Sequence, residues 1–404
     1  MTGTCPVAGV STVDFDHHDA ALDDDRIWAA YAAVREHGNV AWSPAHGGFW
    51  VVSGFDAVRQ ALRDPGSFSS GEGHRIPGNA AVRSIPIDFD PPLHTAYRAI
   101  VMEALRPEKV RALRPWLNKT IDNLWSAFRD NGGGDAVSQV ALPLPLAVLE
   151  KLIGFSPESV AQFREHTERL AASVTSPEQH AADRVAIAEV LRGELDRHRA
   201  TRPDDYITWL LRAEIDGRLL EERELVSVLN TLAVAGHETT MNSVGSLLYL
   251  LATDAGLQRS VREERVPPAQ VVEETFRFRT PAQMFSRYTT REVTLDGTTI
   301  PAGQWVLLLY AAANRDPARF ADADVVRPGR PERGHLAFGW GIHQCVGAAL
   351  ARYELHTLLT TMNRSDPIAL DGRPVFTGVE AGVHYGFRSL RLRFLPDDRG
   401  EVRA

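Results

Sequence analysis

Cysteine is scarce in this chain: its 404 residues include only Cys5 and Cys345. Two cysteines so far apart, one of them in a polar N-terminal stretch, cannot form the disulfide framework that is typical of small secreted domains. No Cys-x-x-Cys pair is present, which argues against a zinc or iron–sulfur site of that kind. Any cysteine chemistry therefore depends on one thiol that acts without a second cysteine as its partner.

Long apolar runs and a strong charge of one sign are also missing. No uninterrupted apolar stretch reaches roughly 18 residues, the length that a membrane-spanning helix needs. The formal net charge is −8 and the pI is about 6.0, so the chain has no overall attraction for nucleic acid or anionic lipid. The first 30 residues contain no charged and then apolar secretion signal. These absences favour a cytoplasmic protein whose partner is a small molecule, with no nucleic acid and no membrane.

Helical periodicity dominates the middle of the chain, and short β-like runs lie toward both ends. Because 44% of the residues are apolar and no repeat or linker divides the chain, we expect a mainly α fold with small β-sheets. We expect a flexible tail over 1–26, a single domain over 27–404, and a loop over 67–88 that is functional or mobile. The predicted helices are 27–37, 57–62, 94–104, 107–129, 143–153, 158–173, 178–199, 204–213, 222–253, 256–262 and 268–278, and the predicted strands lie near 39–42, 48–52, 287–295, 298–309 and within 375–394.

The segment FGWGIHQCVG, from Phe338 to Gly347, surrounds the second cysteine. Its glycines let the backbone turn tightly and approach a flat ligand closely. A helix-forming run follows, so we expect Cys345 at a helix N-terminus, where the positive end of the dipole favours a thiolate before any metal binds. A structural cysteine in a glycine-rich turn is the alternative.

The longest helical pattern, 222–253, carries the polar segment AGHETT, Ala235 to Thr240, at its middle. A glycine inside a helix costs about 1 kcal/mol relative to alanine, and threonine side chains can hydrogen bond to backbone carbonyls. We therefore expect a local distortion that leaves room for a small ligand. A solvated helix face, or a kink without chemistry, is the alternative.

These two segments resemble the cytochrome P-450 superfamily, the haem-thiolate monooxygenases, in its soluble bacterial type. Every fixed position of the family's cysteine loop, Phe-Gly-x-Gly-x-His-x-Cys-x-Gly, is present. The six-residue segment Ala235 to Thr240, which we call the hexad, is similar to the family's oxygen-activation motif, Ala/Gly-Gly-x-Asp/Glu-Thr-Thr/Ser. The resemblance covers about 27–394 and implies the cytochrome P-450 fold, with haem b between the oxygen-side helix (222–253) and the helix of the cysteine loop.

By this resemblance Cys345 is the metal ligand, Thr239 hydrogen bonds dioxygen, and Glu238 links a proton route from solvent. A hydroxyl backed by a carboxylate can deliver the protons that O–O cleavage requires, while the thiolate donates electron density from the other face. Relatives that use hydrogen peroxide directly typically replace this pair. Its presence therefore favours dioxygen with externally supplied electrons.

Haem carries two propionates, which need cationic or hydrogen-bonding partners when they are buried. The resemblance assigns this task to four residues, and the i, i+4 spacing of His94 and Arg98 puts both on one helix face. Taken singly, each is equally well explained as an exposed helix residue or a surface charge. The implied cofactor-binding residues are Cys345, His94, Arg98, Arg287, His343, Phe338, Gly339, Gly347 and Gly236.

Glu274 and Arg277 match the family's Glu-x-x-Arg motif. Such i, i+3 pairs are common on helix surfaces, where they contribute little stability. Here the pair lies between the oxygen-side helix and the cysteine loop, as in the family, so the resemblance implies a structural pair with a downstream third member. Arg327 is our candidate for that member.

The predicted function is a haem-dependent monooxygenase that takes dioxygen and two electrons and hydroxylates or epoxidises a small-to-medium hydrophobic organic substrate. Two alternatives remain: a haem-thiolate enzyme of different outcome (oxidative C–C coupling or a peroxygenase), and a non-catalytic haem-binding module. By resemblance, the substrate lies near the loop 67–87, the hairpin at 383–385, and Leu232, Ala235, Ala282, Gln283 and Phe285.

A ferredoxin-type donor with its reductase is the expected source of electrons. A cluster of basic residues is a candidate docking patch for an acidic donor of this kind. Ordinary solvated helix charge explains the cluster equally well. Its members are Arg98, Arg106, Lys109, Arg111, Arg114 and Arg352.

Overall fold

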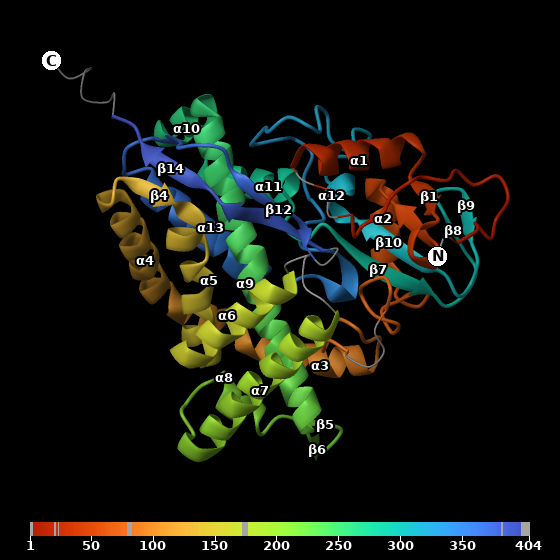
Figure 1. The fold of residues 1–404 in the computed structure, drawn as a ribbon, viewed down its shortest axis with the longest axis horizontal. Helices are drawn as coiled ribbons and strands as arrows, with labels where there is room; N and C mark the ends of the chain where they lie inside the picture. Colours follow the sequence, from red (N-terminus) through yellow and green to blue (C-terminus); the bar gives the residue numbers. More distant parts are fainter. Residues whose placement is uncertain are drawn as a thin grey trace.

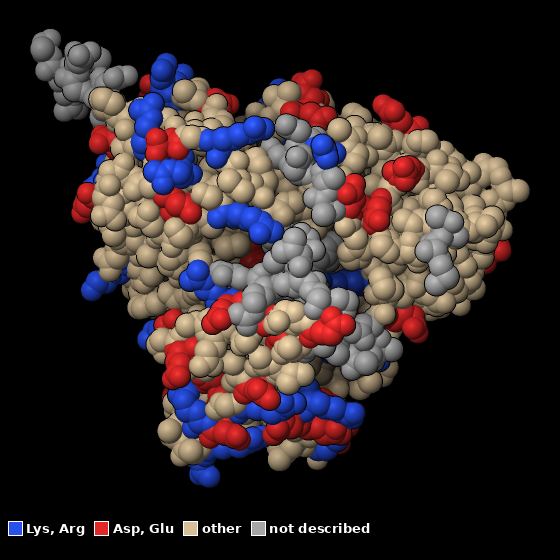
Figure 2. All heavy atoms as spheres, in the orientation of Figure 1, with Lys and Arg blue, Asp and Glu red and all other residues tan. Residues whose placement is uncertain are grey.

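A computed structural model describes residues 3–19, 22, 24–78, 83–171, 177–380 and 383–396. Most helices gather on one side of the molecule and the strands β1, β7, β8, β9 and β10 on the other, with α9 (Glu222–Thr253) crossing the centre (Figure 1). On the face shown in Figure 2, acidic and basic side chains are mixed, most densely over the lower helices. The mainly helical architecture with small sheets is confirmed.

The helices follow the predicted periodicity closely where the pattern is long. The predicted helices 222–253 and 268–278 have the bounds of α9 and α11, whereas 143–153 is divided into α5 and a π-helical turn. Residues 172 and 173 of another predicted helix lie outside the described residues. In chain order the helices are α1 (Asp24–Glu36), α2 (Phe55–Arg63), α3 (Leu93–Ala104), α4 (Pro107–Asp130), α5 (Pro143–Val148), α6 (Pro157–Ala171), α7 (Pro177–Thr201), α8 (Tyr206–Leu210), α9, α10 (Ala255–Arg262), α11 (Pro268–Phe278), α12 (Tyr310–Ala313) and α13 (Ala348–Met362), with short 3-10 or π turns η1 (Ala45–Gly47), η2 (Val137–Ala141), η3 (Leu149–Ile153) and η4 (Gly341–His343). None of the helices in the described ranges combines the length and hydropathy that a bilayer crossing requires.

One five-stranded sheet, in the order β1-β2-β10-β7-β3, joins the N-terminal strands to the segment that follows α11. The β2–β10 pair is parallel, and the other pairs of this sheet are antiparallel. The strands are β1 (Val40–Ser43), β2 (Phe49–Val52), β3 (Phe68–Ser69), β4 (Gly133–Asp135), β5 (Glu214–Ile215), β6 (Arg218–Leu219), β7 (Met284–Thr289), β8 (Val293–Leu295), β9 (Thr298–Ile300), β10 (Trp305–Leu309), β11 (Ile368–Leu370), β12 (Val375–Glu380), β13 (His384–Ser389) and β14 (Arg391–Phe394).

Residues 3–19 lie against this sheet, which corrects our expectation of a flexible tail over 1–26 for this part of the chain. Thr12 forms a bridge with Trp42, and the backbone N–H of Val13 donates to the Trp42 carbonyl at 2.8 Å. Val13 and Phe15 are buried, because side chains two residues apart in an extended segment face the same way. Residues 1, 2, 20, 21 and 23 lie outside the described residues.

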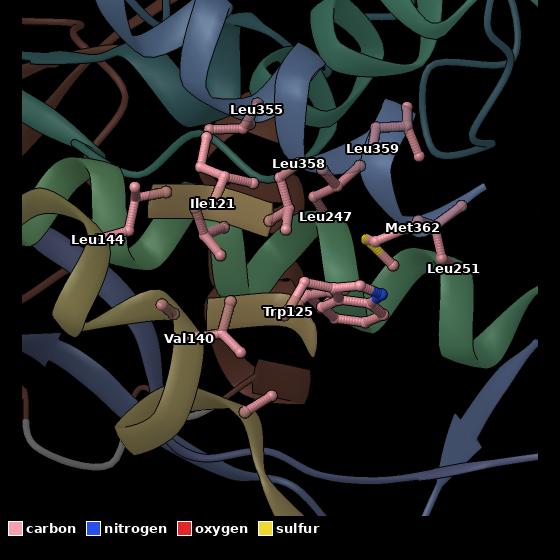
Figure 3. Packing of buried hydrophobic residues seen from close by; sticks show 14 of the residues in the cluster. Ile121, Trp125, Val140, Leu144, Leu247, Leu251, Leu355, Leu358, Leu359 and Met362 are labelled. Atoms are coloured by element: carbon pink, nitrogen blue, oxygen red, sulfur yellow. The ribbon is translucent and has the colours of Figure 1, made fainter. Parts of the chain in front are cut away.

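An apolar cluster holds α4, α9 and α13 together (Figure 3). Trp125, Leu247 and Leu358, one from each helix, are almost completely buried in it. The indole N–H of Trp125 donates to Ser365 Oγ at 2.7 Å, so its one polar atom is satisfied. This cluster fixes the positions of the helix that carries the AGHETT hexad and the helix that follows Cys345.

We predict that Leu358→Ala lowers the free energy of unfolding by about 2–5 kcal/mol, because the truncation leaves a cavity in this cluster. Leu219→Ala is the control: Leu219 is 57% exposed, and its loss changes stability by less than about 0.5 kcal/mol. Urea unfolding followed by far-ultraviolet circular dichroism measures both. Equal effects of the two substitutions would contradict the assignment of the cluster.

Candidate active site

The segment Ala235 to Thr240, at the middle of α9, combines two small exposed residues with four polar ones. Ala235 and Gly236 are exposed, whereas Leu232 and His237 on either side of them are buried. Thr239 Oγ1 donates to the Ala235 carbonyl at 2.7 Å. The helix is continuous through this segment and shows no local distortion of the kind we expected, so the accessible surface comes from the small side chains instead.

Glu238 is held by an ion pair from another element. Its Oε2 lies 2.5 Å from Nδ1 of His384, at the start of β13. Burial by itself would raise the pKa of Glu238, but the neighbouring His384, with smaller contributions from His237 and Arg75, brings that pKa below its usual value. Glu238 is therefore an anion beside Thr239. His384 lies in the hairpin 383–385 that the resemblance placed near the substrate, but its pairing with Glu238 was not predicted.

Backbone hydrogen bonds fold the cysteine loop back on itself. The N–H of Cys345 donates to the Phe338 carbonyl at 2.8 Å, and Gly339 and Gly341 have φ of 65° and 71°, values that favour glycine. A Cβ at Gly341 would lie 2.3 Å from the Leu62 carbonyl oxygen, so this loop packs directly on the end of α2. The loop therefore holds the cysteine sulfur in a defined place.

Burial of the Cys345 thiol works against the thiolate that we expected before metal binding. Cys345 keeps accessible surface, yet the surrounding protein raises the pKa of its thiol through burial. Hydrogen bonds from the N–H groups of Gly347 and Ala348 lower this pKa, but by less. The helix α13 begins only at Ala348, so its dipole does not outweigh the loss of hydration, and a metal cation is needed to complete the stabilisation.

The four side chains expected at the propionates come together from three separate segments. His94 and Arg98 lie on α3, Arg287 on β7, and His343 in η4. The imidazole centroids of His94 and His343 are 4.4 Å apart. Burial and then the charge of Arg287, followed by His94 and Arg98, lower the pKa of His343 to about 2. Two neutral imidazoles thus lie beside two permanent cations.

This cluster fits a bound group that carries two carboxylates. Nε2 of His94 is buried and has no hydrogen-bond partner among the described residues. Arg98 donates to the Gln344 carbonyl at 2.6 Å and Arg287 to the Ser286 carbonyl at 2.7 Å, and within the described ranges neither has a carboxylate partner. Because unpaired cations are costly in a protein interior, haem propionates would complete the site.

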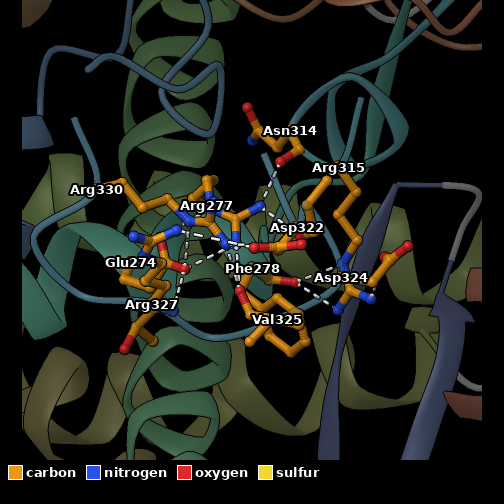
Figure 4. A network of polar contacts seen from close by, with 12 residues as sticks. Glu274, Arg277, Phe278, Asn314, Arg315, Asp322, Asp324, Val325, Arg327 and Arg330 are labelled. Carbon is orange, nitrogen blue, oxygen red and sulfur yellow. Dashed lines mark hydrogen bonds and ion pairs between the residues drawn. The ribbon is translucent and has the colours of Figure 1, made fainter. Parts of the chain in front are cut away.

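Glu274 and Arg277 form a bidentate ion pair in the interior (Figure 4). The two hydrogen bonds are 2.8 and 2.7 Å long, and each side chain is at most 5% exposed. Arg277 also donates to the carbonyls of Asn314 and Ala323, both at 2.8 Å. This pair therefore ties the end of α11 to the chain that leads to the cysteine loop.

The third member of the network is Arg330, and the prediction of Arg327 was wrong. Nε of Arg330 donates to Glu274 Oε1 at 3.0 Å, and its side chain is 3% exposed. Arg327 contributes only its backbone N–H, at 2.7 Å from Glu274 Oε1, while its 56% exposed side chain points toward Asp322. Nothing in the sequence distinguishes the two arginines, because the choice depends on how the loop turns.

Of the predicted substrate residues other than Gln283, two keep accessible surface and two are buried. Ala235 is exposed on α9, and Phe285 is half-buried with its ring 5.6 Å from that of Tyr310. Leu232 and Ala282 are buried at 7% exposure each, Leu232 within an apolar cluster and Ala282 paired with His384. Residues 79–82 of the predicted substrate loop lie outside the described residues.

Gln283 was wrongly predicted to face the substrate. It has no exposed surface, its Oε1 accepts from Tyr31 at 2.9 Å, and its amide nitrogen donates to the Thr280 carbonyl. Gln283 is thus fully buried and engaged at both its carbonyl oxygen and its amide nitrogen inside the protein, so it does not face a ligand. Gln283 instead fastens α1 to the turn after α11.

Comparison with known proteins agrees with this geometry. The family model for cytochrome P450 matches residues 155–267 and 268–364. The chain is 32% identical to the cytochrome P450 monooxygenase PikC of Streptomyces venezuelae over 86% of each protein. It is 34% identical to the cyclomarin C epoxidase CymV of Salinispora arenicola, over 85% of this chain and 90% of that protein. The crystal structure of CYP108D1 from Novosphingobium aromaticivorans superposes with a TM-score of 0.83 at 29% identity, covering 96% of this chain and all of that one.

A thiol on a glycine-rich loop, an acid and a hydroxyl on a central helix, and a mainly helical fold define a haem-thiolate protein. The chain belongs to the cytochrome P450 family. It is a monooxygenase whose cofactor is haem b, which confirms the resemblance drawn from the motifs.

We predict that Arg330→Ala destabilises the haem-loaded protein by about 3–5 kcal/mol, because it leaves the buried Glu274 carboxylate without one of its partners. Arg327→Ala is the matched control and costs less than about 1 kcal/mol, since its backbone N–H remains. Chemical unfolding and the ratio of haem to protein absorbance measure the effect. A loss of equal size in the control would refute the assignment of Arg330.

Proposed function

We propose that this P450 activates dioxygen with two electrons from a ferredoxin-type donor and its reductase. Its substrate is a small-to-medium hydrophobic organic molecule, which it hydroxylates or epoxidises. The observation that carries the proposal is the pair Glu238 and Thr239, an ionised carboxylate and a hydroxyl next to the exposed surface of α9. One relative of similar length is an epoxidase by name, which supports this type of reaction. We further propose that residues 27–404 form one catalytic domain.

The haem, when bound, supplies the iron at which dioxygen is reduced and one oxygen atom is transferred. Cys345 would be its metal ligand, and His94, Arg98, Arg287 and His343 would hold the propionates. The small residues Gly236, Gly339 and Gly347 would let the backbone approach the porphyrin. Phe338 would support the loop, since its ring packs at 4.6 Å from Phe276 with Arg352 over its face at 4.4 Å.

Thr239 and Glu238 have separate tasks in this proposal. The hydroxyl hydrogen of Thr239 is engaged by the Ala235 carbonyl, which leaves Oγ1 free to accept a hydrogen bond. Thr239 would thus hold a water molecule beside the exposed surface of α9. The Glu238 carboxylate would exchange protons with solvent, and His384 would act as a positioning residue that keeps this carboxylate ionised.

The basic cluster named above is our proposed docking surface for the electron donor. Three of its members are already paired: Arg106 and Lys109 with Glu103, and Arg352 with Glu273. Arg111 and Arg114 have no carboxylate partner among the described residues, so they would contribute most to attraction of an acidic donor. We propose a cytoplasmic location, because a reducing compartment keeps Cys345 available as a thiol.

We predict that Thr239→Ala retains haem and substrate binding but lowers the product formed per NADH by roughly tenfold or more, as expected for loss of a proton-delivery group. The electrons then appear as hydrogen peroxide. Thr253→Ala is the matched control, because Thr253 makes the same 2.7 Å bond to a carbonyl four residues earlier on α9 but lies at the end of the helix. NADH consumption, peroxide and product are measured together with any compound that shifts the haem spin state. Unchanged coupling in Thr239→Ala would disprove its proposed role.

We predict that His384→Gln raises the pKa of Glu238, because the ion pair and hydrogen bond that lower it are removed. The carboxylate is then protonated at a higher pH, so the acid limb of the pH profile of product formation moves to higher pH. His37→Gln, at an exposed histidine bonded to Ser11, leaves the profile unchanged. A lower rate with an unshifted acid limb would show that His384 is merely structural.

A further inference from the structure

Three histidines meet at a place that the proposed monooxygenase chemistry does not use. His17 and His18 belong to the N-terminal segment, and His46 lies in η1, the turn between β1 and β2. One ring nitrogen from each residue lies within 4.8 Å of the other two. The ring centroids are 4.1 Å apart for His17 and His18, 5.1 Å for His17 and His46, and 4.9 Å for His18 and His46.

Each imidazole has one nitrogen engaged by an oxygen atom. Nε2 of His17 and Nε2 of His18 lie 3.0 and 2.8 Å from the Ile76 carbonyl oxygen. Nε2 of His46 lies 2.6 Å from Oδ1 of Asp16. A carbonyl or carboxylate oxygen only accepts, so these contacts put the hydrogen on Nε2 and leave one lone pair per ring. Metal-binding histidines have this arrangement, with the second ring nitrogen on a carbonyl or a carboxylate.

His17 supplies an independent indication of a missing ligand. It is 2% exposed, and its Nδ1 is buried without a hydrogen-bond partner among the described residues. A buried acceptor without a partner is costly unless something binds to it. Burial, followed by the neighbouring His18, lowers the pKa of His17 to about 3, so the ring is neutral and its lone pair is available at ordinary pH.

We propose that His17, His18 and His46 bind one divalent transition metal ion of the zinc class, each through one ring nitrogen. Imidazole nitrogen suits this class of ion, and three such ligands leave a fourth position for water. With metal–nitrogen bonds of about 2.0–2.1 Å, tetrahedral ligands lie roughly 3.4 Å apart, so nitrogens that are up to 4.8 Å apart must draw together by up to about 1.4 Å. The exposed side chains of His18 and His46 can make this movement.

The proposed site would join three parts of the chain. The N-terminal segment and η1 contribute the ligands, and Ile76, in the loop after β3, accepts hydrogen bonds from two of the rings. A bound metal would therefore fasten the N-terminal segment and this loop to the five-stranded sheet. The site shares no residue with the cluster of His94, Arg98 and Arg287, and does not depend on the proposed reaction.

The test uses untagged, haem-loaded protein, because a histidine tag would itself bind metal. After equilibrium dialysis against micromolar zinc, elemental analysis gives zinc and iron per chain, and the iron serves as the internal reference for folded protein. We expect one zinc per haem iron in the wild type and in the control His356→Gln, which removes an exposed histidine of α13. We expect the double variant His18→Gln/His46→Gln to lose that zinc while its haem content stays the same.

Anomalous diffraction at the zinc edge then locates the ion in wild-type crystals independently of any variant. A peak among the three imidazoles supports the proposal. Absence of bound zinc in the wild type, a peak elsewhere, or undiminished zinc in the double variant would each overturn it.

Discussion

Holding a sulfur anion inside a protein is the physical constraint on which the catalytic structure depends. Burial raises the pKa of the Cys345 thiol, and the N–H groups of Gly347 and Ala348 offset this only in part. The loop can therefore present a thiolate only to a cation that replaces the lost hydration. Its glycines and its internal hydrogen bond to Phe338 hold the sulfur in place, so that binding of the metal need not also order the chain.

The same requirement for paired charge explains the arrangement around the loop. Glu274 is buried with two arginines, Arg277 and Arg330, that also donate to backbone carbonyls. Arg98 and Arg287 have no carboxylate partner in the described part of the protein, which matches a cofactor that carries its own carboxylates. The two arginines thus lack negative partners until a cofactor with carboxylates binds. In the Glu274 network, by contrast, every charge has a partner within the protein, so this network stabilises the fold by itself.

Periodic helices and motifs of fixed spacing could be recognised from the sequence, and the long helices α9 and α11 have their predicted bounds. The bounds of such helices depend on nearby residues, because the apolar stripe and the residues that end the helix lie within the helix itself. Gln283, Arg327 and the N-terminal segment were misjudged for the opposite reason. Gln283 accepts a hydrogen bond from Tyr31, and Arg330 rather than Arg327 reaches Glu274 because of how the chain turns after α12. The N-terminal segment is hydrogen bonded to β1. All of these partners lie far away in the sequence.

The sequence by itself indicated the class of this protein, through a cysteine in a loop that has every fixed position of the haem-thiolate pattern and an acid followed by a hydroxyl at the middle of an apolar helix. Only the tertiary structure decided which distant groups act on these residues. It brought His384 to Glu238, Arg330 to Glu274, and His46 to His17 and His18. The physical reason is that ion pairs and ligand sets require atoms within a few ångströms, and chain folding, rather than spacing along the sequence, sets those distances.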